Sequence, residues 1–234
     1  MKDELRRVIE AGRQKAAADL VPRVDDSPPS QPGGWTAKDH LAHLTAWRLN
    51  LAAELDSLRT GAPAPVVAED DVQNAKFYEE TQGLPAAAVM ARDNSAWDAL
   101  VAAVGACTED ELRMPRPRNQ REAAWQAVAG NSSQHVAEHL AYMARETGDA
   151  AAEESAARWS HEIANAVFSD DTLRGNAEYN LGCFYAVRGR AREAIPYLRK
   201  GIELNPDLRE WAGKDSDLDP IRSDAELAHL LGVG

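Results

Sequence analysis

The sequence contains no long apolar run. No segment of its 234 residues approaches the roughly 18–20 consecutive apolar residues that form a transmembrane helix. The opening segment, residues 1–14, lacks the apolar stretch of a secretory signal peptide and reads as an amphipathic helix. We therefore expect a cytoplasmic protein that has no membrane partner.

Basic residues are scarce relative to acidic ones, with 26 Lys and Arg against 38 Asp and Glu, and the net charge is −12. This balance disfavours binding to a phosphate backbone, so we expect no nucleic-acid partner. The one compact basic cluster, RMPRPR at 113–118, carries two prolines and reads as a solvated loop. The two cysteines, Cys107 and Cys183, fall in different predicted domains, which argues against a disulfide framework and favours two buried or half-buried thiols.

The alternating β-branched residues that strands need are missing, and the periodicity that is present is helical. Residues 23–34 contain prolines and glycines and read as a loop. Thr36 and Asp39 form a capping-box pattern, and Gly148 can end the last long helix. The predicted helices span 3–20, 36–59, 71–82, 85–105 and 121–147, with a brief turn at 108–111. Four long helices with short connections predict an all-α protein that begins with an antiparallel four-helix bundle over residues 1–148.

Residues 149–234 follow a different pattern. The segment 177–206 resembles one tetratricopeptide repeat, with small residues where two helices cross, a turn at Gly189 and a stop at Pro206. Because one repeat cannot bury its own face, we expect the helix over 154–168 and the terminal segment 217–231 to complete a small TPR-like helical domain. Ser223 and Glu226 predict a capping box for the last helix.

Two histidines lie one helical turn apart in the segment SSQHVAEHLAYM at 132–143. On a helix, His139 falls inside the arc of apolar side chains and His135 falls at its edge, so both imidazoles point toward the interior. Their β-carbons are then about 5–6 Å apart, which lets two ring nitrogens meet one metal ion. The alternative is that each is a buried histidine that donates to a backbone carbonyl.

A catalytic zinc-type site needs three protein ligands and one open position. The helix over 36–59 offers two candidates for the third ligand in the segment WTAKDHLAHLTAW. His40 lies close to the leucine stripe of this helix and His43 lies on its flank, and geometry alone does not choose between them. His161 and His229 lack a partner histidine and are expected to be structural or surface residues.

Residues 34–44, GWTAKDHLAHL, resemble the signature of the DinB-like superfamily, which a HxxxH-type helix follows later in the chain. Residues 1–148 are similar to the four-helix bundle of that superfamily, and the members it most resembles are of the ClbS/DfsB type or the N-terminal type of mycothiol-dependent maleylpyruvate isomerase. The resemblance implies that His43, His135 and His139 are the metal ligands. His40 stands where the family usually has an apolar residue, so we expect it to contact a ligand rather than the metal.

The superfamily includes thiol-dependent transferases and isomerases, and hydrolases that disarm reactive small molecules. The resemblance therefore implies a detoxification or self-resistance enzyme that adds water or a low-molecular-weight thiol to a reactive small molecule. A divalent transition metal, Zn²⁺ or Ni²⁺, is the expected cofactor, since three imidazoles suit either ion. Trp47, Asn74 and Tyr78 are candidate substrate-binding residues, with plain packing as their alternative role. No general base beyond the metal ligands is visible in the sequence.

Two other functions are compatible with these residues. The first is a non-catalytic protein that sequesters a small molecule or uses the TPR-like unit to bind a protein partner or a second copy of itself. The second is a DNA-damage role, which the superfamily's name suggests and which the acidic charge disfavours. Turnover of more than one equivalent of substrate distinguishes an enzyme from a sequestering protein.

Overall fold

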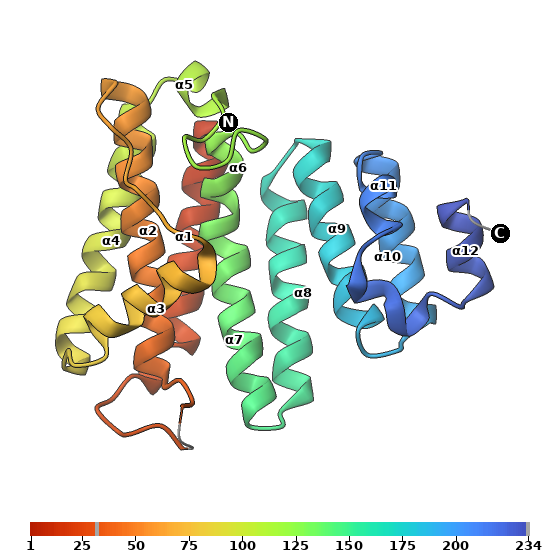
Figure 1. Cartoon of the computed structure of the whole chain (residues 1–234), viewed down its shortest axis with the longest axis horizontal. Helices are drawn as coiled ribbons and strands as arrows, with labels where there is room; N and C mark the ends of the chain where they lie inside the picture. Colours follow the sequence, from red (N-terminus) through yellow and green to blue (C-terminus); the bar gives the residue numbers. More distant parts are fainter. Residues whose placement is uncertain (31–32, 233–234) are drawn as a thin grey trace. The chain divides into compact units, whose positions relative to one another are not determined.

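The computed structural model describes residues 1–30 and 33–232 (Figure 1). Over these ranges the chain is all-helical, as the sequence predicts, and the only extended pairing is an isolated bridge between Pro115 and Ala123. Residues 31 and 32 of the predicted loop 23–34 lie outside the described residues. None of the helices in the described ranges combines the length and the apolar character that crossing a membrane requires.

The chain divides into two compact units. Unit 1 comprises Met1–Met143, and unit 2 begins at Ala144, within the last turn of the helix that ends at Glu146. The division therefore falls slightly before the boundary that the sequence predicts after residue 148. Each unit buries its own set of apolar side chains, so each has a core of its own.

Four long helical segments build most of unit 1 (Figure 1). They are α1 (Lys2–Asp19), α2 (Ala37–Thr60), α4 (Ala86–Ala106) and a broken segment made of α6 (Ala124–Ala129), η2 (Gly130–Gln134) and α7 (His135–Glu146). The short elements between them are η1 (Val21–Arg23), α3 (Asp70–Thr81) and α5 (Glu109–Arg113). Helix α2 packs along α4, while α1 contacts α4, α6 and η2, so their apolar faces enclose one core.

Helix α2 carries the largest share of the buried polar residues. Its predicted capping box is formed, since Asp39 N donates to Thr36 Oγ1 at 3.2 Å and Thr36 N donates to Asp39 Oδ2 at 2.8 Å. Gly61 ends the helix with a φ of 72°, in the left-handed region that glycine adopts readily. Its apolar stripe is fully buried at Leu41, Leu44, Leu51 and Leu55.

A buried ion pair joins α2 to α4. Arg48 Nη1 donates to the Asp93 carboxylate, and the side chains of the two residues are 0% and 6% exposed. Asp93 also accepts from Thr45 Oγ1 at 3.0 Å and from Trp97 Nε1 at 3.1 Å. The Arg48 guanidinium lies 3.7 Å from the centroid of the Trp97 ring. A shift of α2 along α4 would separate the two charges and leave each buried and unpaired, which is costly. The cluster therefore holds the two helices in one register.

The helix predicted over 121–147 is present over residues 124–146, but it contains a π-helical turn that the sequence does not predict. Gly130–Gln134 forms a π-helical turn, which changes the direction of the side chains that follow, beginning with His135. Gly12 of α1 faces this turn, and a Cβ at that position would lie 2.1 Å from the Ser132 carbonyl oxygen. The close approach of two backbones therefore requires a glycine in α1.

The basic segment 113–118 is largely an exposed loop, as predicted, but Arg116 is an exception. Arg116 is 8% exposed and donates through Nε and Nη2 to Glu54 Oε2 at 3.0 and 2.7 Å. Its Nη1 donates to Glu122 Oε2 at 2.8 Å. The guanidinium thereby anchors the segment to α2. Local sequence patterns do not predict this pairing, because Glu54 lies 62 residues earlier in the chain.

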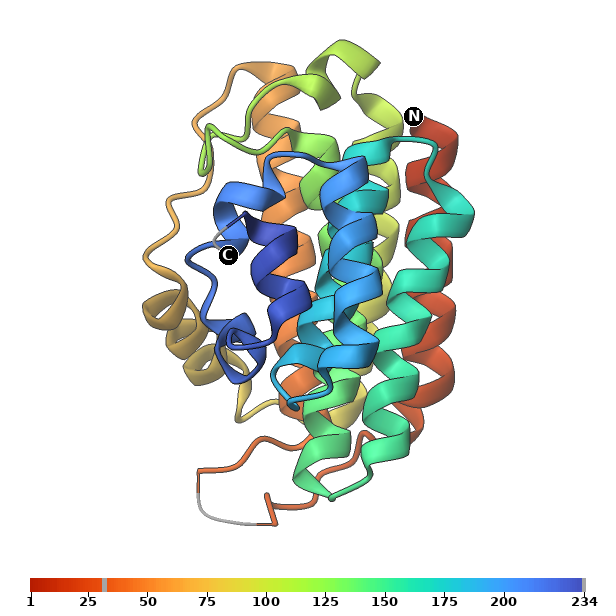
Figure 2. The same cartoon turned by 90° about the vertical axis from the view of Figure 1, so that its right-hand side faces the viewer.

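Unit 2 contains the remaining helices, shown from a second side in Figure 2. They are α8 (Ala150–Val167), α9 (Asp171–Ala186), α10 (Ala191–Leu204), α11 (Leu208–Ala212), η3 (Ser216–Ile221) and α12 (Ala225–Leu231). Helices α9 and α10 pack closely because small residues lie at their contact: a Cβ at Gly182 would lie 2.7 Å from the Leu198 side chain, and one at Gly201 would lie 2.9 Å from the Gly175 carbonyl oxygen. Gly189 makes the turn between them with a φ of 68°.

The ends of two helices in unit 2 differ from the sequence-based expectation. The predicted capping box of Ser223 and Glu226 is wrong, because Asp224 is the N-cap and its side chain accepts from Glu226 N at 2.9 Å. The helix predicted over 154–168 begins earlier, after Asp149, whose side chain accepts from Ala152 N at 2.9 Å.

Both cysteines are buried as free thiols, as predicted. Burial raises the pKa of the Cys107 thiol and the pKa of the Cys183 thiol above the ordinary value. A raised pKa keeps each group protonated at neutral pH, which fits a packing role rather than that of a nucleophile.

Replacing Gly12 with alanine is expected to destabilise the protein by about 1–3 kcal/mol, since the new methyl group meets rigid backbone in η2. The measurement is the urea concentration at the midpoint of unfolding. Gly105→Ala in α4 is the matched control, because a Cβ there meets no atom within 4 Å. The control is expected to stabilise by up to about 1 kcal/mol, from helix propensity alone. Equal effects of the two variants would contradict the close approach of α1 to η2.

Candidate metal centre

The structure brings the three predicted metal ligands together. His43 comes from α2, and His135 and His139 come from successive turns of α7. One ligand atom from each lies within 4.8 Å of the other two, and His43 and His139 are buried while His135 is half-buried. Two helices that are distant in sequence thus place three imidazoles around one point.

The nitrogen atoms of this cluster converge in a way that suits a cation. His135 Nε2 lies 3.2 Å from His43 Nε2 and 3.2 Å from His139 Nε2. One ring N–H can donate a hydrogen bond in only one of these two N···N contacts. A cation placed between three unprotonated nitrogens can instead interact with all three. Zn–N distances of about 2.0–2.1 Å in a tetrahedral site place ligand nitrogens roughly 3.3 Å apart, close to the separations found here.

A fourth imidazole completes the cluster from α2. His40 is 3% exposed, and its Nδ1 lies 2.7 Å from His139 Nδ1. If His139 Nε2 faces a metal, its proton is on Nδ1 and is donated to His40 Nδ1, which then carries its own proton on Nε2. This is the position that the sequence analysis expects for His40, beside a ligand rather than at the metal.

Burial keeps these imidazoles neutral. Desolvation lowers the pKa of His40 and the pKa of His43 to about 4, and it lowers the pKa of His135 to about 3. The pKa of His139 is also well below its ordinary value, through desolvation first and then the neighbouring histidines. The nearby Arg48 charge further disfavours protonation of His135 and His139. Neutral imidazoles are the form that binds metal ions, so the donor set is ready at neutral pH.

Trp35 covers the histidine cluster. Its ring centroid lies 5.3 Å from that of His40, 5.2 Å from that of His43 and 6.1 Å from that of His139. On its other side it stacks with Tyr78, at 6.0 Å between centroids and 13° between planes. The indole therefore limits the approach of water to the imidazoles from this direction.

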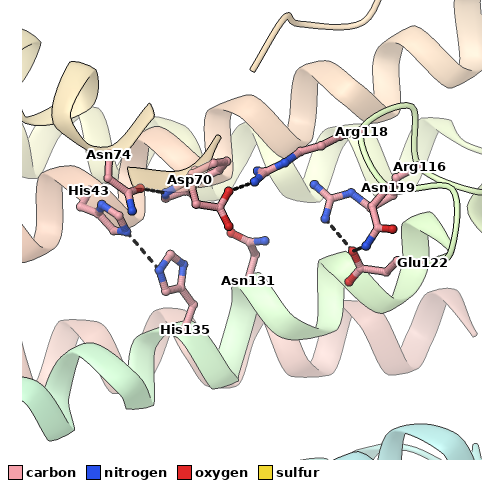
Figure 3. Close-up of a pocket in the computed structure, with 10 residues that line it drawn as sticks. His43, Asp70, Asn74, Arg116, Arg118, Asn119, Glu122, Asn131 and His135 are labelled. Carbon is pink, nitrogen blue, oxygen red and sulfur yellow. Dashed lines mark hydrogen bonds and ion pairs between the residues drawn. The ribbon is translucent and has the colours of Figure 1, made fainter. Parts of the chain in front are cut away.

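An open cavity of about 360 Å³ adjoins the histidines (Figure 3). Cavities of several hundred Å³ accommodate small organic molecules. In Figure 3 His43, Asn74 and His135 lie at one end, and Arg116, Asn119 and Glu122 lie at the other. Asn131, Asp70 and the guanidinium of Arg118 lie between them, and Trp47 also lines the cavity. The cavity thus connects the candidate metal centre to a strongly polar region.

Two of the three predicted substrate-binding residues lie at this cavity. Trp47 Nε1 donates to Asn74 Oδ1 at 3.0 Å, so α2 and α3 are joined at its wall. Tyr78 does not line the cavity, and it packs on Trp35 instead. Its place on α3 is one turn after Asn74, which explains why the sequence pattern grouped the two.

Several residues of the site, among them Trp35, Arg118 and Asn131, do not appear among the sequence-based candidates. Trp35 lies inside the quoted motif, but nothing in the sequence shows that it faces the histidines. Arg118 belongs to the basic segment that reads as a surface loop. Asn131 lies in the π-helical turn, where its Nδ2 donates to the Ala127 carbonyl at 3.3 Å and its buried Oδ1 has no hydrogen-bond partner among the described residues.

A second group of side chains with metal-binding atoms lies in unit 2, formed by Cys183, Asp215 and Asp217. The Asp215 carboxylate already accepts from Tyr179 Oη at 2.8 Å and from Trp211 Nε1 at 3.1 Å. Its lone pairs are therefore engaged by hydrogen-bond donors, and this group is best described as a structural hydrogen-bond network.

Lowering the pH from 7 to 5 is expected to reduce the free energy of unfolding of the metal-free protein. Unfolded histidine titrates near 6.5 and folded His40 near 4, so in this interval the unfolded chain binds more protons. The contribution is complete above pH 6.5 and is lost as the pH falls toward 4, at up to about 1.4 kcal/mol per pH unit. Urea unfolding at several pH values should show a shallower pH dependence for His40→Gln. The exposed His229 is the control, and His229→Gln should retain the full slope.

No protein-family model matches the chain, and neither a curated protein nor a solved structure gives a significant match. The functional assignment therefore depends on the geometry of the site itself.

Proposed function

We propose that unit 1 is a DinB-like four-helix bundle that holds a divalent transition-metal ion, Zn²⁺ or Ni²⁺, through His43, His135 and His139. The proposed activity is the addition of water or a low-molecular-weight thiol to an electrophilic small molecule. The observation that carries this proposal is the convergence of three neutral Nε2 atoms beside an open cavity.

The donor set fits such an ion. Three neutral imidazoles match the ligands of catalytic zinc sites, and the cavity beside His43 and His135 leaves room for a further ligand. When bound, the ion lowers the pKa of a coordinated water or thiol and so supplies a nucleophile near neutral pH.

The residues around the ligands hold them in the form that binds metal. The contact between His40 Nδ1 and His139 Nδ1 allows His139 to donate its proton to His40, and in that tautomer Nε2 of His139 is free to bind the metal. The buried charge of Arg48 raises the cost of protonating His135 and His139. Trp35 packs against His40 and His43, while His43 and His135 line the cavity, which gives a ligand access to the site.

The cavity wall offers fixed groups to a substrate. Trp47 and Asn74 hold each other through a hydrogen bond, and together they present one rigid wall next to His43. Asn131 Oδ1 is an acceptor without a partner, which suits it to receive a hydrogen bond from a bound molecule. These contacts orient a substrate with its reactive carbon toward the histidines.

Unit 2 belongs to this proposal as a TPR-like domain that binds a protein partner or a second copy of the chain. Its support is the close packing of α9 against α10 at glycines and the turn at Gly189. Its role is separable from the chemistry, since the three candidate ligands and the cavity residues all belong to unit 1.

The His43→Ala variant is expected to lose bound metal. Wild-type protein incubated with Zn²⁺ and desalted should retain about one ion per chain, because three ligands define one site. The affinity of the variant for Zn²⁺ should fall by well over roughly 10- to 100-fold, which is the loss expected when a residue hydrogen-bonded to a metal ligand is removed. The measurement is elemental analysis of protein purified without chelator, with the doubly substituted His135→Ala/His139→Ala chain alongside.

The control for metal loss is His229→Ala, which changes an exposed histidine of unit 2 and should leave the metal content unchanged. Full retention of metal by His43→Ala would show that the three histidines do not form the site. Helical content measured by circular dichroism distinguishes the loss of a ligand from the loss of the fold.

Turnover distinguishes catalysis from sequestration. The Zn²⁺-loaded protein should convert more than one equivalent of an electrophile such as an epoxide or an unsaturated ketone, with water or a small thiol as co-reactant. The measurement is product per protein chain over time, with the His43→Ala variant as the inactive reference. Binding that saturates at one equivalent without product would instead support the stoichiometric binding protein.

A further inference from the structure

Two arginines with different surroundings line the cavity beyond the histidines. Arg116 is enclosed, and all of its charge is matched by two carboxylates: Glu54 Oε2 accepts from Nε and Nη2, and Glu122 Oε2 accepts from Nη1. Its task is to hold the segment before α6 against α2. A ligand would have to break a buried, hydrogen-bonded network to use it, which is costly.

Arg118 is held in a different manner. Its guanidinium lies 4.5 Å from the centroid of the Trp47 ring, and its side chain is 25% exposed. The ion-pair partner of Arg118 is Asp70, the first residue of α3, and the Asp70 side chain is 69% exposed. An ion pair with an exposed carboxylate contributes little free energy, so another carboxylate can replace Asp70 at small cost.

The surroundings of Arg118 keep its guanidinium in one place. The Trp47 indole on which it stacks is 8% exposed and is fixed by the hydrogen bond from Nε1 to Asn74 Oδ1. A stacked, planar guanidinium with a replaceable partner is a preorganised receptor for a carboxylate, which it binds through two parallel N–H groups. Figure 3 shows the Arg118 guanidinium in the middle of the cavity, between the His43–His135 pair and the Arg116–Glu122 pair.

We propose that Arg118 binds a carboxylate group of the substrate, with Trp47 and Asn74 as its positioning residues and Asp70 as the group that the carboxylate displaces. This inference rests on the proposed function and narrows its substrate class to electrophilic small molecules that carry a carboxylate. The carboxylate binds at Arg118 and the reactive carbon lies toward His43 and His135.

The test measures the binding of benzoate to the full-length protein, and benzamide serves as a neutral probe of the same shape. Binding is measured both with Zn²⁺ and after a chelator has removed the metal and has itself been removed. Isothermal titration gives the dissociation constant, and the indole N–H resonance of Trp47 reports the site. Benzoate should bind both forms and shift this resonance. Arg118→Gln should weaken benzoate binding about tenfold or more, as expected when a charge-assisted hydrogen bond is lost. Arg118→Lys should give an intermediate loss, because lysine keeps the charge without the fork.

Two further variants make the result specific. Asp70→Asn should tighten benzoate binding about two- to fivefold, because the competing carboxylate is gone. Arg113→Gln, an exposed arginine of α5 that does not line the cavity, should bind benzoate like the wild type. A general electrostatic effect would make Arg113→Gln and Arg118→Gln equal, and a structural role of the Asp70 pair would make Asp70→Asn weaken binding.

Several outcomes would overturn the inference. They are equal affinity for benzoate and benzamide, an Arg118→Gln variant that binds as tightly as Arg113→Gln, and loss of benzoate binding on removal of the metal. Metal content measured on Arg118→Gln keeps this test separate from the proposed function. A variant that retains Zn²⁺ and loses benzoate supports both, whereas one that retains both ligands contradicts only the role of Arg118.

Discussion

The buried ion pair between Arg48 and Asp93 is the interaction on which unit 1 depends. It places a positive charge inside the core, where the Asp93 carboxylate pairs with it and the Trp97 ring covers it, while Thr45 and Trp97 donate to Asp93. Burial is the main reason why the imidazoles of α7 stay neutral, and the Arg48 charge adds to this effect. The ion pair therefore fixes α2 against α4 and contributes to the low pKa values of His135 and His139.

The second constraint is the contact between α1 and the π-helical turn. Gly12 lets the backbone of η2 come close to α1, and the turn directs the side chains of α7 that follow it. A π-turn has poorer hydrogen-bond geometry than an α-helix, and such turns are found most often beside functional sites. Here it lies directly before His135 and contributes Asn131, with its unpaired acceptor, to the cavity. The less favourable hydrogen-bond geometry of the π-helical turn therefore occurs next to residues that line the cavity.

The cavity combines two kinds of chemistry. Neutral imidazoles lie at one end, where the pKa values of the histidines are held low by burial. The rest of the cavity contains charges that are almost all paired, and Arg118 differs in having an exposed partner, Asp70, at the start of α3. Helix α3 contributes Asn74, which contacts Trp47, and Asp70, which pairs with Arg118, one helical turn apart.

The amino-acid sequence by itself determined the helical class, the capping box at Thr36, the turn at Gly189, and the inward direction of the histidines. These features follow from local periodicity and from contacts between residues a few positions apart. Tertiary structure alone decided the π-turn at Gly130, the burial of Arg116 against Glu54, and the arrangement of Arg118 over Trp47. It also decided that Tyr78 stacks on Trp35 rather than lining the cavity. Each of these depends on a side chain or backbone far away in sequence, and local patterns carry no information about which distant group will be the partner.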